Sequence, residues 1–315
     1  MESCECSSLS FFGGISMKDV YLLSGFLGSG KTTLLANFIQ ELKQRGLKPA
    51  VIMNELGALN FDSQAVEEGV PLKEMLNGCI CCSGAEKTEA QVQSLLAESD
   101  WDVLLIETTG AAHPVEALDA VYSPLFANEL NIKGIVTIAD SKRWLHRQEM
   151  TPQTRSLFLE QIRHAHLILA NKADLLTDEE MAQVTYEIQG FNEHAQILQT
   201  VNAKIPFAFL EKLEATATGE VKKADIGHHL HLSSRLLHFE EGEAYSMEEV
   251  EDWVRSLPET VYRMKGYVPI EGMSHPMLFQ YAYGLTQWMP EYMKMEPNLV
   301  IIGDHVDEIP LLGRL

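Results

Sequence analysis

Six short apolar runs that alternate with helix-period segments constrain the fold of this chain more than any other feature. The runs are rich in Val, Ile and Leu and nearly continuous, which is typical of strands buried on both faces of a parallel sheet. They span residues 20–25, 50–55, 102–108, 134–140, 167–172 and 195–201. Strands that alternate with helices, such as the helix expected over 31–46, predict right-handed crossovers and an α/β fold with helices on both faces of a mostly parallel sheet.

The rhythm changes after about residue 215. The small and polar stretch EATATGEVKKADIG predicts a linker. A helix expected over 246–258 and strand-like pieces up to 298–304 then indicate a small α+β domain. We therefore expect a mobile tail over residues 1–16, an α/β domain over 17–220 and an α+β domain over 221–315. Met17 is a candidate for the natural start, because ordered structure is expected to begin just after it.

The overall charge narrows the classes of partner. A formal net charge of −21, from 45 acidic and 24 basic residues, disfavours binding to nucleic acid or to an anionic membrane. Five cysteines, three of them clustered, do not form a disulfide framework of the secreted type, so a reducing cytoplasm is expected. The acidic N-terminus lacks the basic region of a signal peptide, and no apolar run is long enough to span a membrane. The oligomeric state stays open, a homo-oligomer included.

The segment GFLGSGKTT, from Gly25 to Thr33, follows an expected strand and opens an expected helix. Its spacing matches the P-loop pattern, in which backbone N–H groups and a helix N-terminus bind phosphate oxygens. Lys31 is expected to reach the β- and γ-phosphates, and Thr32 is expected to place its hydroxyl on Mg²⁺. The loop residues predicted to bind nucleotide are Gly25, Gly28, Ser29, Gly30, Lys31, Thr32 and Thr33.

Two later segments are consistent with a nucleotide site. DVLLIETTG is an expected buried strand that ends in Glu107, where an acid on the magnesium side belongs, and Gly110 can offer a backbone N–H to a γ-phosphate. Lys31 and Glu107 are therefore the predicted catalytic residues. NKAD, from Asn171 to Asp174, follows another expected strand. Asp174 can accept both N–H donors of a guanine edge, which adenine cannot match.

The remaining NKAD residues have expected roles as well. The aliphatic stem of Lys172 can cover the base, and Asn171 can either bond the base or brace the loop around it. Together these residues favour guanine over adenine.

Cys79, Cys81 and Cys82 lie close together in the segment NGCICCSG. Cys-x-Cys-Cys is not the Cys-x-x-Cys pattern of thioredoxin-like redox pairs, and a disulfide between adjacent cysteines would be strained. Soft thiolates suit Zn²⁺ or Cu(I), and three protein ligands leave a fourth position open. The alternative is that one or two of these residues are core cysteines.

The motifs GFLGSGKTT, NELG, LNGCICC, ETTG and NKAD, in this order, resemble those of the CobW-type metallochaperone GTPases. The resemblance runs from Met17 through nearly the whole chain and includes LPETVYRMKGYVPIEG and NLVIIG near its C-terminus. It implies a P-loop GTPase domain followed by a CobW C-terminal domain. It also implies an enzyme that hydrolyses GTP with Mg²⁺ and delivers Zn²⁺ or another transition metal to a recipient metalloprotein.

The segment NELGALNFD adds two expected ligands. Glu55 is the expected fourth, oxygen ligand of the cysteine-bound metal, and Asp62 is an expected ligand of Mg²⁺. Two positions depart from the family pattern: Ala58 stands where an acid is usual, and His113 stands where an aspartate usually follows the ETTG motif. These departures leave zinc, cobalt, iron and nickel open as the delivered metal. Three histidines near the expected linker have two possible roles: they bind a metal, or they are exposed linker residues without a specific role. They are His228, His229 and His231.

Other functions stay open at this stage. The chain could activate a cobalt, corrinoid or iron enzyme, or it could buffer metal while GTP only sets its conformation. A P-loop kinase of a small molecule, with structural cysteines, is a further alternative that a phosphorylated product would reveal.

Overall fold

The computed structural model describes residues 17–54, 70–75, 85–98, 100–119, 121–213, 232–240, 242–282 and 284–313. The expected tail over 1–16 lies outside these ranges. The expected linker after residue 215 also lies outside them, because residues 214–231 are not described. The domain boundaries at residues 17 and 220 therefore remain predictions.

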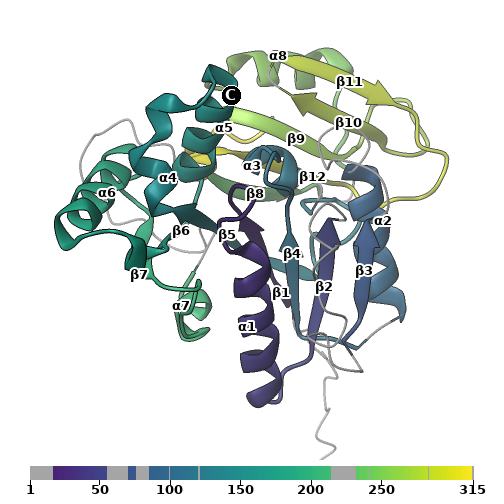
Figure 1. Cartoon of the computed structure of the whole chain (residues 1–315). Coiled ribbons are helices and arrows are strands. Elements are labelled where there is room, and N and C mark those ends of the chain that lie inside the picture. The colour runs from purple at the N-terminus through teal and green to yellow at the C-terminus, as the bar shows by residue number, and fades with distance from the viewer. Residues whose placement is uncertain are drawn as a thin grey trace, which may run out of the picture.

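A parallel sheet of seven strands forms the first part of the chain (Figure 1). Its strands are β1 Lys18–Ser24, β2 Pro49–Asn54, β3 Leu72–Met75, β4 Val103–Glu107, β5 Leu130–Asp140, β6 Leu167–Asn171 and β7 Gln196–Thr200. Their order in space is β3-β2-β4-β1-β5-β6-β7, and every neighbouring pair is parallel. The predicted α/β fold is confirmed, and all six predicted strands are present.

Strand β3 was not predicted. Its sequence, Leu-Lys-Glu-Met, contains no continuous apolar run. It lies at the edge of the sheet and pairs only with β2, from Val51–Leu72 to Asn54–Met75. An edge strand needs fewer apolar residues than a central one, which explains why the pattern missed it.

Helices cover both faces of this sheet (Figure 1). The helices of this part are α1 Lys31–Gln44, α2 Ala85–Glu98, α3 Pro114–Asp119, α4 Ser141–Leu145, α5 Pro152–Arg163, α6 Asp178–Phe191 and α7 Ala208–Glu211, with short 3-10 turns η3 Arg147–Glu149 and η4 Ala173–Leu175. Helix α6 begins after Thr177, because Thr177 and Glu180 form a reciprocal capping box. No helix in the described part of the chain is long and apolar enough to cross a membrane.

Hydrophobic clusters lie on both faces of the sheet, and β1 contributes to one on each face. Val20 and Leu22 pack into one core, whereas Tyr21 and Leu23 pack into the other. Successive side chains of a strand point to opposite faces, so a strand between two layers of helices must be apolar at every position. This explains the continuous apolar runs of the sequence.

A second, antiparallel sheet follows, with the order β11-β10-β9-β12-β8. Its elements are β8 Leu232–His238, α8 Met247–Ser256, β9 Val261–Val268, β10 Met277–Ala282, β11 Leu285–Met289, β12 Asn298–Asp304 and the 3-10 turn η5 Val306–Glu308. Leu299 and Ile301 of β12 pack with Trp253 of α8, and Val300 and Ile302 join a core of the parallel sheet. The small α+β part is thus packed against the first through one face of its sheet.

Candidate functional site

Four central strands end at the same edge of the parallel sheet. The segment 25–33 follows β1, and Glu107, Asp140 and Asn171 are the last residues of β4, β5 and β6. The register places Leu23 beside Glu107 and Asp140 beside Asn171. Ligands of open α/β sheets bind at the carboxyl ends of strands, so this edge is the candidate site.

The glycines of the loop hold conformations that other residues rarely adopt. Gly25, Gly28 and Gly30 have φ angles of 133°, 76° and 118°. A Cβ atom on Gly25 would lie 2.3 Å from the carbonyl oxygen of Ile138, and one on Gly30 would lie 2.7 Å from Nδ2 of Asn171. The loop can therefore pass close to β5 and β6 only with glycine at these positions.

A cavity of about 240 Å³ opens between the loop and the end of β4. Helix α1 starts at its wall, and no side chain caps its N-terminus. The first backbone N–H groups of the helix and its dipole therefore remain available to an anion. The cavity is lined by Leu27, Gly28, Gly30, Lys31, Thr32, Thr33, Glu107, Thr108, Thr109 and Gly110.

Lys31 lies inside this loop with 6 % of its surface exposed. Its Nζ donates to the carbonyl oxygens of Gly25 at 2.7 Å and of Phe26 at 3.2 Å. Burial lowers the pKa of Lys31, and the charge of Glu107 partly opposes this shift. The ammonium group is thus held at the loop, where phosphate oxygens would compensate for its lost hydration.

Thr32 and Glu107 face each other across the cavity. The Thr32 hydroxyl donates to Oε1 of Glu107 at 3.1 Å. Burial raises the pKa of Glu107, whereas Lys31 and the Thr32 hydroxyl act in the opposite direction. A hydroxyl and a buried carboxylate are hard oxygen donors, so this pair fits Mg²⁺.

Gly110 brings the turn after β4 against the loop. A Cβ atom on Gly110 would lie 2.6 Å from the backbone nitrogen of Leu27. Gln161 of α5 holds the same turn, because its Nε2 donates to the carbonyl oxygens of Gly110 at 3.2 Å and of Ala112 at 3.3 Å. No local pattern pointed to Gln161, since it lies 51 residues from Gly110.

Asn171 braces the loop. Its Nδ2 donates to the carbonyl oxygen of Ser29 at 2.7 Å, and its Oδ1 accepts from Oγ1 of Thr200 at 3.1 Å and from the backbone nitrogen of Ala203 at 2.8 Å. Asn171 is 2 % exposed. Of the two expected roles, the structure favours the bracing one.

Of the remaining residues of the NKAD motif, Lys172 contacts Asp140 and Asp174 is exposed. Lys172 has a left-handed backbone with φ 64°, and its Nζ donates to Oδ2 of Asp140 at 2.7 Å. Asp140 also caps α4 by accepting from the backbone nitrogen of Arg143 at 3.0 Å. Asp174 lies in η4 with its side chain exposed. The motif therefore presents one anchored lysine and one accessible carboxylate.

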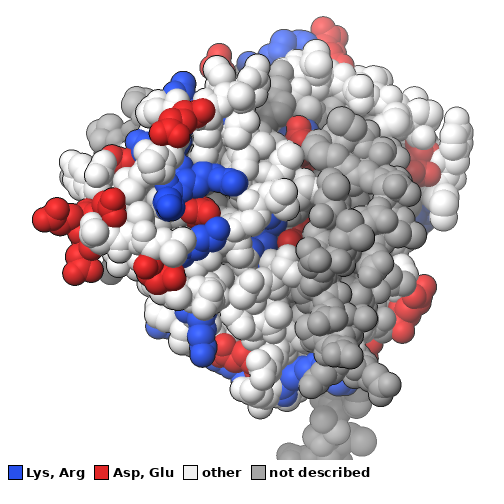
Figure 2. All heavy atoms as spheres, viewed as in Figure 1, with Lys and Arg blue, Asp and Glu red and all other residues white. Residues whose placement is uncertain are grey.

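Arg143 is a site neighbour that the sequence analysis did not identify. Its Nη1 donates to the carbonyl oxygen of Leu27 at 3.1 Å. Figure 2 shows blue basic and red acidic side chains side by side on this face of the molecule, so the surface drawn there does not carry a charge of one sign only. The signal that could have found Arg143 is its place just after Asp140, which ends a strand next to β1.

Several expected metal ligands lie outside the described residues. They are Glu55, Asp62, Cys79, Cys81, Cys82, His228, His229 and His231.

Family models match both parts of the chain. The model described as "CobW/HypB/UreG, nucleotide-binding domain" matches residues 19–199, and the model of the "Cobalamin synthesis protein cobW C-terminal domain" matches residues 235–315.

Three curated relatives share between 28 % and 31 % of their aligned residues with this chain. The chain is 31 % identical to "Zinc-regulated GTPase metalloprotein activator 1" of Dictyostelium discoideum, and the alignment covers 67 % of this chain. It covers only 51 %, about half, of the length of that relative. It is 28 % identical to "Zinc chaperone CobW" of Pseudomonas aeruginosa over 94 % of this chain and 90 % of that protein. It is 29 % identical to "Zinc chaperone YeiR" of Escherichia coli over 75 % of this chain and 69 % of that protein.

A solved structure supports the fold. The Zn(II)-bound YjiA GTPase of E. coli superposes with a TM-score of 0.53 at 23 % identity, over 93 % of this chain and 96 % of that one. At this identity the similarity concerns the fold alone.

Proposed function

This chain belongs to the CobW/HypB/UreG family, and on that premise we propose that it is a GTP-hydrolysing metal chaperone. It binds a transition metal at Cys79, Cys81 and Cys82, and Zn²⁺ is the metal that we propose for this site. It passes this metal to a recipient metalloprotein in the cytoplasm. We keep the proposed division into a GTPase domain over 17–220 and a C-terminal domain over 221–315.

One observation carries the nucleotide part of the proposal. Lys31, Thr32, Glu107 and Gly110 all line one cavity at the N-terminus of α1. A buried ammonium group, an uncapped helix N-terminus and two hard oxygen donors form a set that matches a nucleoside triphosphate with Mg²⁺. Gly25, Gly28, Ser29, Gly30 and Thr33 complete the proposed phosphate loop.

Hydrolysis of GTP requires the protein mainly to position the reacting groups and to stabilise the negative charge on the phosphates, and it requires little covalent chemistry from the protein. Bound Mg²⁺ would neutralise charge on the phosphate oxygens, with Thr32 and Asp62 as its proposed ligands. Lys31 binds the phosphates directly, and Glu107 holds the Thr32 hydroxyl in place. Gly110 offers its backbone N–H from a turn that already contacts the loop. Lys31 and Glu107 are therefore the proposed catalytic residues.

Guanine selection rests on the NKAD motif. The exposed carboxylate of Asp174 can accept the two N–H donors of guanine. Lys172 is anchored through its Nζ to Asp140, so its aliphatic stem has a defined position for covering the base. Asn171 joins this motif to the phosphate loop through Ser29.

The strand ends support Glu55 as a fourth ligand. β2 and β3 are parallel neighbours that end side by side at Asn54 and Met75. Glu55 is the next residue after β2, and Cys79 is the fourth residue after β3. Adjacent strands lie about 4.8 Å apart, and four residues reach at most about 14 Å. Both ligand segments therefore leave the sheet edge from neighbouring points, on the side of β4 away from β1.

The same placement suggests how nucleotide and metal influence each other. Glu107 ends β4, which lies directly beside β2. A γ-phosphate that orders the turn after Glu107 and the segment after Asn54 would move Glu55 relative to the cysteines. Metal affinity then differs between the GTP and GDP states.

The test uses the full chain. Phosphate release from GTP and from ATP is measured first, and Zn²⁺ affinity is then measured by competition titration with GDP and with a non-hydrolysable GTP analogue. We expect preference for GTP and a change in Zn²⁺ affinity of roughly 5- to 150-fold, the range of typical allosteric coupling. Equal use of ATP and GTP would refute the guanine assignment, and equal Zn²⁺ affinity in both states would refute the coupling.

Two other outcomes identify the competing functions. Transfer of phosphate to a small molecule instead of water would indicate a kinase. Tighter and nucleotide-dependent binding of Co²⁺ or Fe²⁺ than of Zn²⁺ would indicate an activator of a cobalt, corrinoid or iron enzyme.

A further inference from the structure

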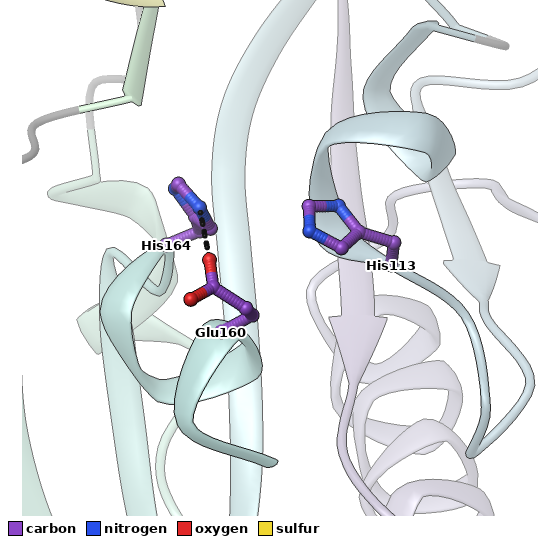
Figure 3. Close-up of side chains that lie close together, drawn as sticks. All are labelled: His113, Glu160 and His164. Atoms are coloured by element: carbon purple, nitrogen blue, oxygen red, sulfur yellow. Dashed lines mark hydrogen bonds and ion pairs between the residues drawn. The ribbon is translucent and has the colours of Figure 1, made fainter. Parts of the chain in front are cut away.

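Two imidazole rings and a carboxylate meet outside the nucleotide cavity (Figure 3). His113 precedes α3, whereas Glu160 and His164 lie one helical turn apart at the end of α5. One ligand atom from each of the three side chains lies within 4.8 Å of the other two. In Figure 3 the ring of His113 points across the gap toward Glu160 and His164.

We propose that His113, Glu160 and His164 form a second metal site, which binds Zn²⁺ or a similar borderline divalent ion. The site is separate from the three cysteines, and it does not depend on GTP hydrolysis.

The spacing inside the cluster fits coordination. Nε2 of His164 lies 3.1 Å from Oε2 of Glu160. Two ligands on a tetrahedral ion, with bonds of about 2.0–2.1 Å, stand roughly 3.3 Å apart. His113 completes the set, because its ring centroid lies 5.9 Å from that of His164. The ligand atoms lie within 4.8 Å of one another, so His113 must move inward for its nitrogen to reach the same ion.

A histidine satisfied only by core hydrogen bonds is the competing explanation for His164. Its side chain is 5 % exposed, and its Nδ1 has no hydrogen-bond partner among the described residues. A buried nitrogen without a partner is costly. The described residues therefore satisfy only the Nε2 side of this ring, and that nitrogen is the one that faces Glu160.

The donor set selects the class of ion. Two imidazoles and one carboxylate with an open fourth position are typical of Zn²⁺ sites. Mg²⁺ and Ca²⁺ prefer sites made of oxygen ligands alone, so the two imidazoles select against them. Burial lowers the pKa of His113, with the nearby His164 and Arg263 acting in the same direction and Glu160 opposing them. The neutral imidazole is the form that binds metal.

Two features limit the affinity. The guanidinium of Arg263 adds positive charge near His113, and the carboxylate of Glu160 offsets it. Nδ1 of His113 accepts a long, 3.3 Å hydrogen bond from the backbone nitrogen of Val115. Coordination through Nε2 needs a proton on Nδ1 and gives up this bond.

The place of the cluster connects three parts of the molecule. His113 lies three residues after Gly110, and Gln161, next to Glu160, holds the carbonyl oxygens of Gly110 and Ala112. Tyr262 of β9 stacks edge-on against His164 at 6.0 Å. A metal here would tie the turn after β4 to α5, beside the second sheet.

The test first removes the three clustered cysteines. The full chain with Cys79, Cys81 and Cys82 replaced by serine is titrated with Zn²⁺ in competition with a chromophoric chelator, and separately with Co²⁺. We expect one bound ion, with cobalt ligand-field bands and no thiolate charge-transfer band. Adding His113→Asn should weaken Zn²⁺ by at least about tenfold, since loss of even an outer partner of a metal ligand costs 10- to 100-fold.

A matched control is His146→Asn, which removes an exposed histidine that pairs with Glu149 at 3.1 Å and should leave Zn²⁺ affinity unchanged. His113→Asn alone, with the cysteines intact, should lower the zinc stoichiometry by one ion while thermal unfolding without metal stays the same. Absence of Zn²⁺ binding in the triple-serine protein, or equal affinity with and without His113→Asn, would overturn the proposal. Both readouts work without nucleotide, so a chain that fails as a GTPase could still carry this site.

Discussion

The side-chain amide of Asn171 donates a 2.7 Å hydrogen bond to the backbone carbonyl of Ser29, across 142 residues of sequence. This contact joins the loop that follows β1 to the motif that follows β6. It connects the proposed phosphate loop directly to the proposed base-binding motif. Substitutions of Asn171 and of Asp174 should therefore have different consequences.

Asn171→Ala should weaken binding of GTP and GDP by the same factor and destabilise the protein by about 1–3 kcal/mol, the usual cost of leaving buried polar partners unsatisfied. The partners left behind are the oxygen of Ser29, the hydroxyl of Thr200 and the backbone nitrogen of Ala203. Calorimetric titration and urea unfolding measure the two effects. A selective loss of preference for guanine over adenine would show instead that Asn171 acts on the base.

Asp174→Ala should lower GTP affinity by roughly two orders of magnitude or more without changing the free energy of unfolding, because two guanine donors lose their acceptor. The side chain is exposed, so the fold does not need it. Asp174→Asn should shift preference toward xanthine nucleotides. Fluorescent-nucleotide competition checks both variants, and an unchanged GTP affinity would exclude Asp174 as the guanine ligand.

Lys31→Ala should abolish hydrolysis, because the ammonium group is held directly at the phosphate loop. Glu107→Ala should reduce turnover with a smaller loss of nucleotide binding, since it acts through Thr32 and the bound metal. Single-turnover phosphate release separates the two effects. Lys43→Ala, in the last turn of the same helix, is the control. Normal turnover in the Lys31 variant would mean that the cavity is not the hydrolytic site.

Cys81→Ser should weaken Zn²⁺ binding and remove its dependence on nucleotide while GTP affinity stays constant. A free thiol has a pKa of about 8.5, so Zn²⁺ must displace protons, and binding to the unmodified chain should tighten as pH rises. Replacing Cys4 and Cys6 in the N-terminal tail provides matched control variants. Equal Zn²⁺ affinity of the unmodified chain and of the triple-serine variant at pH-matched conditions would contradict the proposed chaperone site.

Asp140→Asn should destabilise the protein at neutral pH by about 1 kcal/mol, a value reduced because the partner Lys172 is partly exposed. Burial alone would raise the pKa of Asp140, but hydrogen bonds from Lys172 and from the backbone nitrogen of Arg143 outweigh it and lower the pKa. A carboxylate with a lowered folded-state pKa contributes stability above its unfolded value of about 3.9, and this contribution is lost as the pH falls through the folded value.

The difference in unfolding free energy between Asp140→Asn and the unmodified chain should therefore shrink toward zero in acid, as the pH falls below the unfolded-state pKa of about 3.9 and through the lower folded-state pKa. Urea unfolding at a series of pH values measures it, with Asp174→Asn as the exposed control. A difference that stays constant down to low pH would show that the charge of Asp140 does not cause the stabilisation, since asparagine caps a helix as well as aspartate does.

Local patterns in the sequence were sufficient to predict six strands of the parallel sheet and the loop after β1. The apolar runs identify six strands because a strand buried on both faces must be apolar at each position, as Val20 to Leu23 illustrate. The loop over 25–33 is recognisable because its glycines, Lys31 and Thr32 all lie within one strand–turn–helix unit. β3 escaped because a short edge strand has no such pattern.

Contacts between distant segments were decided only by the tertiary structure. Three contacts join residues from separate elements. They are the hydrogen bond from Asn171 to Ser29, the hydrogen bond from Gln161 to Gly110, and the cluster of His113 with Glu160 and His164. They depend on the order in which β4, β1, β5 and β6 lie side by side. Hydrophobic periodicity shows which residues are buried but carries no information about which strand becomes the neighbour of which, so these pairings exist only once the sheet has assembled.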